Sequence, residues 1–351
     1  MDGIRIGMIG CGKLATDRAK SIMGMDELTL TTVMDTNREA ATRLAELTGA
    51  RATTELEEVL AGKDVDAVYI ATPHALHAQQ AIAAAEHGKH MLVEKPLATE
   101  VEDGEGVIRA CRKAGVVLSV GYQRRFMCGA QEVRKMATDG SLGHILYVRN
   151  CYNTNHVDTR SVDWHTDTKL SGGGGLFNHG THALDILRYV TGLDVDEVYA
   201  RIACPPDRPG LDYVASLALT FRNTDAIGSV EVLSCAAGGS RVKMEDGIYG
   251  QSGLDVVGTR GHVYWHGFVN VFPVEPIGDL KPGEWQQLPY EKADQDAGIL
   301  ADFVRAIRTG SQPRATGEDG LATVELVQAA YESGRTNRPV RLKNRHLELA
   351  Q

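Results

Sequence analysis

The chain has 351 residues, of which 43% are hydrophobic and 24% are charged, as in an ordinary globular protein of two domains. Its formal net charge of −9 argues against nucleic acid or an anionic membrane as a partner, because both require a cationic face. No apolar run approaches the length that spans a bilayer, and the N-terminal residues form no signal-peptide pattern. The six cysteines are dispersed without a Cys-x-x-Cys pair, so we expect reduced thiols in a cytoplasmic protein.

Short apolar strands alternate with helices in the first third of the chain. Strands are predicted over residues 4–9, 28–34, 65–71, 90–93 and 116–120. Helices are predicted over residues 13–23, 38–47, 75–86 and 101–114. Strands that alternate with helices in this way form βαβ units, so residues 1–121 are predicted to contain a parallel sheet.

Beyond residue 121 the strands follow one another with few helices between them. They are predicted over residues 143–152, 197–204, 211–221, 225–235, 254–257 and 262–271, and helices over 298–308 and 320–333. In the third of these strands every second residue is apolar, which places Ala215, Leu217, Leu219 and Phe221 on one face. We therefore predict an α+β domain over residues 122–343 with a large, mostly antiparallel open sheet, and a solvated tail over residues 344–351.

A glycine-containing turn joins the first predicted strand to the first helix. Its sequence, Gly10-Cys11-Gly12-Lys13-Leu14-Ala15, permits a tight turn, close approach of the backbone to a pyrophosphate and close packing of helix on sheet. Asp35 follows the second strand, about 20 residues further on, where a carboxylate accepts the ribose hydroxyls of the adenosine half. The sequence thus predicts an α/β fold whose first domain is a doubly wound Rossmann sheet that binds a dinucleotide.

The residues after the second strand also bear on the choice of cofactor. The Asp35 carboxylate repels a 2′-phosphate, which favours NAD over NADP. Arg38 offers a partner to a phosphate, but a solvated helix position or the adenine face is the favoured interpretation. We count Thr36 and Arg38 among the expected cofactor contacts.

Three further segments concentrate chemically useful side chains. Ala71-Thr72-Pro73-His74-Ala75-Leu76-His77 and Glu94-Lys95-Pro96 each lie at the carboxyl end of a strand, where α/β sheets bind ligands. The third segment is Gly172-Gly173-Gly174-Gly175-Leu176-Phe177-Asn178-His179-Gly180-Thr181-His182. Together these segments resemble the Gfo/Idh/MocA oxidoreductase family, which includes glucose–fructose oxidoreductase and inositol dehydrogenases. The resemblance extends from residue 4 to about residue 342.

The resemblance implies that Lys95 and His182 are catalytic. Oxidation of a secondary alcohol needs a base for the hydroxyl proton, and a histidine with a pKa near 6.5 suits that role. Lys95 can donate a hydrogen bond to the developing alkoxide or pass a proton. Many family members have Asp four residues before the histidine, whereas this chain has Asn178. An amide can orient His182 but cannot stabilise an imidazolium as a carboxylate does, so Lys95 is expected to carry more of the proton transfer.

The resemblance also implies which residues contact the ligands. Glu94 is expected near the nicotinamide ribose, and Pro96 is expected in the cis form. The expected cofactor contacts are Gly10, Cys11, Gly12, Lys13, Leu14, Asp35, Thr36, Arg38, Thr72, Pro73, His74, His77, Glu94, Lys95 and Gln123. The expected substrate contacts are Lys95, Tyr122, Arg124, Arg125, His156, Trp164, His165, Asn178, His179 and His182.

Several of these assignments have alternatives. An ion pair that supports the domain interface is as good an interpretation of Arg124 or Arg125 as a substrate contact. His156, Trp164 and His165 suit a polyhydroxylated ring, but they would also suit a surface loop or an oligomer contact. The run Gly172–Gly175 is interpreted as a flexible segment that leads to the site. The spacing of His179, His182 and Asp185 permits a metal site, but none is predicted, because hydride chemistry does not need one.

The sequence therefore predicts an NAD(P)-dependent dehydrogenase that oxidises a CH–OH group of a sugar, sugar derivative or cyclitol. One alternative is a glycosidase-like enzyme that oxidises a sugar transiently, eliminates an aglycone and returns the hydride. A second is a catalytically silent regulator that senses a sugar or NAD. The resemblance further implies a homodimer or homotetramer, with no nucleic-acid or membrane partner.

Overall fold

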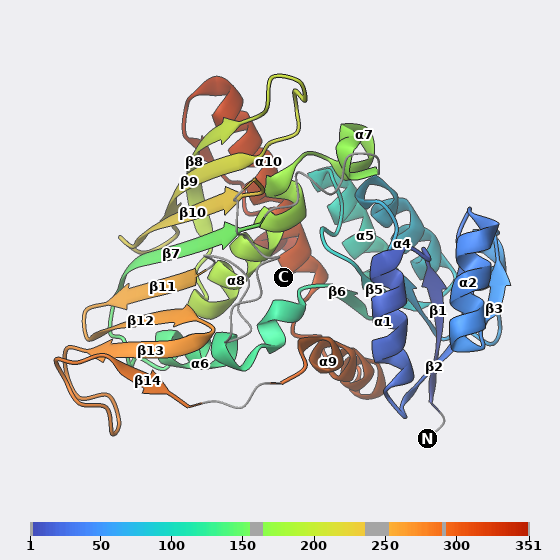
Figure 1. The fold of residues 1–351 in the computed structure, drawn as a ribbon, viewed down its shortest axis with the longest axis horizontal. Helices are drawn as coiled ribbons and strands as arrows, with labels where there is room; N and C mark the ends of the chain where they lie inside the picture. Colours follow the sequence, from blue (N-terminus) through green and yellow to red (C-terminus); the bar gives the residue numbers. More distant parts are fainter. Residues whose placement is uncertain (1–2, 155–163, 236–252, 290–292, 350–351) are drawn as a thin grey trace. The chain divides into compact units, whose positions relative to one another are not determined.

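The computed structural model describes residues 3–154, 164–235, 253–289 and 293–349, which form two compact units (Figure 1). The first unit contains Met1–Gln123 and Asp294–Val324, and the second contains Arg124–Ala293 and Glu325–Gln351. Residues 122–343 were predicted to form a single domain, whereas residues 294–324 belong to the first unit. The reason is that helix α9 (Gln295–Thr309) packs against helix α1 (Lys13–Met23).

The first unit is built on a parallel six-stranded sheet in the order β3-β2-β1-β4-β5-β6. Its strands are β1 (Ile4–Ile9), β2 (Leu28–Met34), β3 (Arg51–Thr53), β4 (Ala67–Ile70), β5 (His90–Val93) and β6 (Leu118–Val120). Its other helices are α2 (Arg38–Thr48), α3 (Leu56–Leu60), α4 (His77–Glu86) and α5 (Val101–Ala114). The predicted Rossmann sheet is confirmed, although β3 and α3 were not predicted, because both are too short to establish a periodic pattern.

The register of β1 determines what meets at the carboxyl edge of this sheet. Ile9 pairs with Met34 of β2 and with Ile70 of β4. The residues that follow these three strands are therefore brought to one place, where parallel sheets bind ligands. Residues from the glycine turn, the end of the second strand and the Ala71–His77 segment meet in this way.

The second unit is built on a nine-stranded sheet in the order β14-β13-β12-β11-β7-β10-β9-β8-β15. Its strands are β7 (Ile145–Asn153), β8 (Val195–Ala203), β9 (Val214–Phe221), β10 (Ile227–Leu233), β11 (Gly253–Gly258), β12 (Gly261–His266), β13 (Phe268–Pro273), β14 (Gln286–Leu288) and β15 (Val340–Arg341). Only the β7–β10 pair is parallel among these strands. The predicted α/β class, with a mostly antiparallel second sheet, is confirmed.

Helices α6 (Cys128–Thr138) and α8 (Thr181–Thr191) pack on one face of this sheet (Figure 1). In β9 the residues Ala215, Leu217, Leu219 and Phe221 are buried and the residues between them are exposed, as predicted. Asn150 of β7 fastens α8 to the sheet, because its side-chain amide donates to Ala183 O at 2.8 Å. Helices α7 (Thr168–Ser171), α10 (Gly317–Thr336) and α11 (Arg345–Leu349) complete the described chain, with α10 running from one unit into the other.

Two expectations for the second unit differ from the structure. Residues 262–271 were predicted as one strand, but Gly267, with φ +70°, separates β12 from β13 as an antiparallel hairpin. The predicted solvated tail instead forms α11, with Asn344 and His346 buried. Glu325 accepts hydrogen bonds from the backbone of Lys343, Asn344 and Arg345, which anchors the start of this helix. In the described residues, no helix is both long and apolar enough to span a membrane.

Candidate functional site

The glycine turn after β1 has the shape that the sequence predicts. Gly10 has φ +95°, and a Cβ atom there would lie 2.5 Å from Ala71 O, so only glycine fits between the two loops. Gly12 is the N-cap residue of α1, and a Cβ atom there would meet nothing within 4 Å. The helix N-terminus therefore presents bare backbone on its open side, which is the surface a pyrophosphate requires. Lys13 and Leu14 are exposed on the first turn.

Asp35 lies beside this turn with its carboxylate oriented by the backbone. Its oxygens accept hydrogen bonds from Cys11 N and Asn37 N, each at 2.8 Å. Cys11 contributes its amide, while its buried thiol donates to Met34 O and has a pKa raised to about 12 by burial and by Asp35. Thr36 and Arg38 are exposed immediately beyond. The bare helix terminus and the held carboxylate together fit the pyrophosphate and adenosine ribose of a dinucleotide.

Lys95 follows β5 and is half-buried, and the Lys95–Pro96 peptide bond is cis, as the resemblance implies. Completely buried His77 joins this turn to the loop after β4, because its Nδ1 lies 2.7 Å from Pro96 O and its Nε2 lies 2.8 Å from Thr72 O. Burial lowers the pKa of His77, while its contacts with the two carbonyl oxygens act in the opposite direction. His77 therefore contacts the backbone of both segments and links them. His74 is also buried, with its ring 5.8 Å from that of His77, and Pro73 precedes it.

Glu94 is held by buried groups. Its Oε1 accepts from Arg18 Nε at 3.1 Å and from Tyr69 OH at 2.7 Å, and only 3% of the residue is exposed. The Gln123 amide, in the orientation that satisfies its hydrogen bonds, accepts from Arg18 Nη2 at 3.1 Å. Arg18 also pairs with Asp296 of α9. Burial alone would lower the pKa of Arg18, but the carboxylates of Glu94 and Asp296 raise it above its usual range.

His182 lies in the second unit on the first turn of α8, which continues from a π-helical turn over Leu176–Gly180. The Tyr152 ring of β7 stacks beside two histidines of this segment, with centroids 5.6 Å from His179 and 6.4 Å from His182. The Arg124 guanidinium lies 4.2 Å from the centre of the same Tyr152 ring. The Tyr152 ring is therefore the centre of a cluster that contains two histidine rings and one guanidinium.

Arg125 forms a buried ion pair with Asp185, one turn beyond His182 on α8. The Arg125 Nε lies 3.1 Å from each carboxylate oxygen of Asp185, and both side chains are less than 5% exposed. This pair lies within the second unit and ties the segment after β6 to α8. Tyr122, the other predicted substrate contact in that segment, is completely buried.

The glycine run before His182 is closely packed, which corrects its interpretation as a flexible segment. A Cβ atom on Gly173 would lie 2.2 Å from Tyr331 OH, one on Gly174 would lie 2.3 Å from Asp212 O, and one on Gly175 would lie 2.2 Å from Ser234 Oγ. The Asp212 carboxylate accepts from Gly174 N at 2.9 Å, from Leu176 N at 2.6 Å and from Tyr331 OH at 2.5 Å. These positions are therefore glycine because other segments of the same chain lie against their backbone, where a side chain would not fit.

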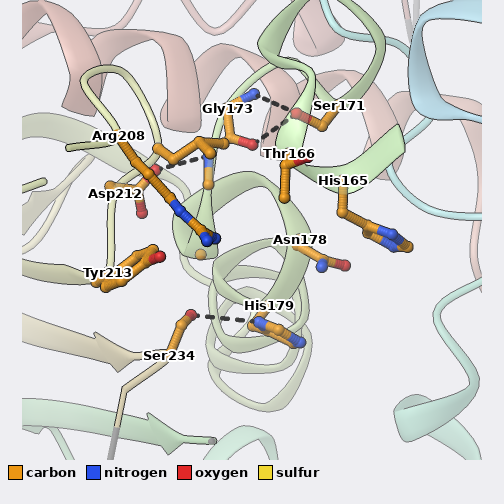
Figure 2. Close-up of a pocket in the computed structure, with 13 residues that line it drawn as sticks. His165, Thr166, Ser171, Gly173, Asn178, His179, Arg208, Asp212, Tyr213 and Ser234 are labelled. Carbon is orange, nitrogen blue, oxygen red and sulfur yellow. Dashed lines mark hydrogen bonds between the residues drawn. The ribbon is translucent and has the colours of Figure 1, made fainter. Parts of the chain in front are cut away.

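A pocket of the second unit opens beside this run (Figure 2). It is lined by His165, Thr166, Ser171, Gly173, Gly174, Gly175, Asn178, His179, Arg208, Leu211, Asp212, Tyr213 and Ser234. Three predicted substrate contacts, His165, Asn178 and His179, are thus brought together, and Trp164 stacks on His165 with ring centroids 3.7 Å apart. His156 lies outside the described residues. No group of three or more His, Cys, Asp or Glu suited to a metal occurs among the residues that the structure describes.

Sequence reasoning missed several members of these sites. Arg18 was detectable, because it lies among Ala15, Ala19 and Ile22 on the buried face of α1, where a charge requires a buried partner. Tyr152, Asp212 and Tyr331 gave no local signal. Each contacts residues 172–182 from a distant part of the chain.

Comparison with known proteins adds independent evidence. The family model for the NAD-binding Rossmann fold of the Gfo/Idh/MocA oxidoreductases matches residues 4–122, and that family's C-terminal domain model matches residues 130–264. The chain is similar to 1,5-anhydro-D-fructose reductase of Ensifer adhaerens, with 28% identity over 97% of this chain and 98% of that protein. It is 25% identical to myo-inositol 2-dehydrogenase of Thermotoga maritima over 97% and 99% of the two chains.

Among solved structures, the WlbA dehydrogenase of Bordetella pertussis, in complex with NADH and UDP-GlcNAcA, matches with a TM-score of 0.81. The two chains are 27% identical, and the match covers 97% of this chain and 98% of that one. The two family models together span more than two thirds of the chain, and the first covers the six-stranded sheet and the glycine turn described above. The chain therefore belongs to the Gfo/Idh/MocA oxidoreductase family and carries its NAD-binding Rossmann domain.

Proposed function

We propose that the chain is an NAD-dependent oxidoreductase that oxidises a secondary alcohol of a sugar, sugar derivative or cyclitol. The observation that carries the proposal is the pairing of bare backbone at Gly12 with the held carboxylate of Asp35 at one edge of the first sheet. That carboxylate favours NAD, because it would repel the 2′-phosphate of NADP. From the family resemblance we also propose a cytoplasmic homodimer or homotetramer, whose mass light scattering would measure.

When bound, the nicotinamide provides the acceptor for the hydride that leaves the alcohol carbon. The chain itself has to move the hydroxyl proton. We assign His182 as the base that accepts this proton at a ring nitrogen, and its stacking beside Tyr152 supports the role by orienting the imidazole plane. We assign Lys95 as the donor of a hydrogen bond to the alcohol oxygen as negative charge develops there. Asn178, on the turn before His182, is a neutral orienting group.

The proposal is tested by screening sugars, sugar acids and inositols with NAD for formation of NADH. We expect Lys95→Met and His182→Asn each to lower kcat by about 100-fold or more, the usual contribution of a proton-transfer group. Binding of NADH, followed by fluorescence, should remain within about twofold for His182→Asn, a small change in free energy. Full activity on a polyol in both variants would contradict the assignment.

A second candidate is a net hydration or elimination that begins with transient oxidation of the sugar. One relative, 31% identical over 189 residues, is named 2,7-anhydro-N-acetylneuraminate hydratase of Escherichia coli, and this chain spans about half of its length. Such a reaction returns the hydride, so product would form with a catalytic amount of NAD and without accumulation of NADH. Product analysis by NMR in the same screen separates the two functions.

A further inference from the structure

The pocket beside the glycine run contains one arginine, Arg208. Arg208 lies between β8 and β9, and its side chain extends into the pocket toward Asn178 and His179 (Figure 2). Both of those residues precede His182 by less than two helical turns. The proposal that follows rests on the proposed function, because it concerns the substrate of the same site.

The acidic side chain that lines the pocket, Asp212, is already hydrogen-bonded to protein groups. The two carboxylate oxygens of Asp212 accept three hydrogen bonds, from Gly174 N, Leu176 N and Tyr331 OH, and only 1% of the residue is exposed. Two of these donors, Gly174 N and Leu176 N, lie at the start of the π-helical turn, so that terminus has little left to offer a ligand. Asp212 is therefore part of the wall that holds the glycine run in place.

Arg208 is engaged far more weakly. Its Nε lies 3.9 Å from Oδ2 of the adjacent Asp207, whose side chain is 77% exposed. An exposed pair at this distance contributes little, since solvent screens it. About a third of the Arg208 side chain remains exposed, at 32%. A guanidinium stays charged at all physiological pH values and offers a planar fork of donors that matches a carboxylate or phosphate.

The other polar groups around Arg208 suit the remainder of a sugar. His165, Thr166 and Ser234 line the pocket and can exchange hydrogen bonds with hydroxyls. Ser234 Oγ lies 3.5 Å from His179 Nδ1, which connects this wall to the stacked rings beside His182. The pocket thus combines a weakly paired cation with hydroxyl-reading groups next to the proposed base.

We infer that Arg208 determines substrate specificity by binding an anionic group, so that the preferred substrates are acidic sugars rather than neutral ones. A sugar carboxylate and a sugar phosphate share this chemistry. The acid group would lie against the guanidinium fork while the hydroxyls face Asn178 and His179. The site would then prefer an acidic sugar, because only that sugar supplies the guanidinium with an anionic partner.

The test compares hexuronates, hexose 6-phosphates and neutral hexoses of the gluco, galacto and manno series in the full-length enzyme with NAD. Arg208→Met removes the charge but keeps the length of the stem, and Arg208→Lys keeps the charge but removes the fork. Arg222→Met, at an exposed arginine that follows β9, is the matched control. Melting temperatures of all variants check the fold.

We expect the wild type to prefer one acidic series, with uronates and phosphates distinguished by which gives the higher kcat/KM. Arg208→Met should lower kcat/KM for that series at least about tenfold, the effect of losing a charge-assisted hydrogen bond, and leave neutral hexoses and NAD within about twofold. The kcat/KM of Arg208→Lys for that series should lie between the values of the wild type and Arg208→Met. The Arg222→Met control should match the wild type. Equal losses for acidic and neutral sugars, or a wild-type preference for neutral hexoses, would overturn the inference.

Failure of the proposed function would be recognised separately. If no sugar yields NADH, calorimetric titration of the NADH-loaded protein with the same sugars measures binding alone. Binding of an acidic sugar to the wild type and the Arg222→Met control, but not to Arg208→Met, would retain the inference and reject the dehydrogenase. Absence of binding, or binding that Arg208→Met leaves unchanged, would reject the inference itself.

Discussion

Individual side chains expected at the cofactor site of the first unit divide into a group that lies at the open sheet edge and groups that are buried within the protein. Asp35 belongs to the first kind, since two backbone amides orient its half-buried carboxylate at the sheet edge. Glu94 and His77 belong to the second kind, because both are buried and bonded to protein groups. The sequence placed all three among the cofactor contacts. Burial, which depends on the tertiary structure, distinguishes their positions.

Asp35 supplies the prediction at this scale. Asp35→Ser removes the charge that favours NAD, so we expect the Kd of NADH to rise about tenfold or more, the effect of losing a charge-assisted hydrogen bond. The Kd of NADPH should fall, because the repulsion of its 2′-phosphate disappears. Fluorescence titration measures both constants. Asp26→Ser, which removes an exposed carboxylate just before β2, should change neither, and unchanged constants in Asp35→Ser would contradict the assignment.

At the scale of elements, glycine has two different purposes in this chain. Gly12 leaves open the side of a helix terminus where a ligand can approach. Gly174 allows two protein segments to touch, because Asp212 occupies the space where a side chain would be. The same residue type thus leaves a helix terminus open in α1 and permits close packing before α8.

These two glycines permit a matched comparison by identical substitutions. Gly12→Ala should leave the free energy of unfolding nearly unchanged but weaken NADH binding, because its Cβ atom would lie in open space on the ligand side. Gly174→Ala should lower the free energy of unfolding by about 1–3 kcal/mol, since its Cβ atom overpacks the Asp212 backbone. Urea denaturation and NADH titration measure both effects. Equal stability losses in the two variants would refute this distinction.

For the whole molecule, partly and completely buried histidines contribute to how stability depends on pH. His90 Nδ1 accepts a hydrogen bond from Val117 N at 3.0 Å, which requires an unprotonated nitrogen. Burial lowers the pKa of His90, and it also lowers the pKa of His77. The unfolded chain therefore binds more protons than the folded one near pH 6. Stability is expected to fall as the pH decreases through the unfolded value of about 6.5 toward the lower folded values.

His90→Asn keeps an acceptor near the Nδ1 position and removes the titration. We expect it to flatten the decline in stability between pH 7 and 5.5 by at most one proton, about 1.4 kcal/mol per pH unit. His87 has the opposite sign, because bonds to Ala83 O and Glu57 raise its pKa. Its contribution is present at low pH and lost as the pH rises, so His87→Asn should steepen the same decline. Urea denaturation across this pH range tests both signs.

The sequence by itself determined the local structure of this protein. Helix α1, strand β2 and helix α5 begin and end where hydrophobic period and glycine positions predict, because those signals act between near neighbours. The Gly10–Gly12 turn and Asp35 were predictable for the same reason. The hairpin at Gly267 was missed, since two strands of similar composition follow one another with a single glycine between them.

Only the tertiary structure decided which distant segments complete the sites. Arg18 meets Glu94 and Asp296, and Gly174 meets Asp212 and Tyr331, across separations that no local pattern spans. The same holds for α9, which belongs to the first unit although strands β7–β14 of the second sheet precede it in the chain. Such contacts depend on the order in which strands pair and on the burial that results, so the groups that hold the glycine run and the pocket around Arg208 emerge only from the folded chain.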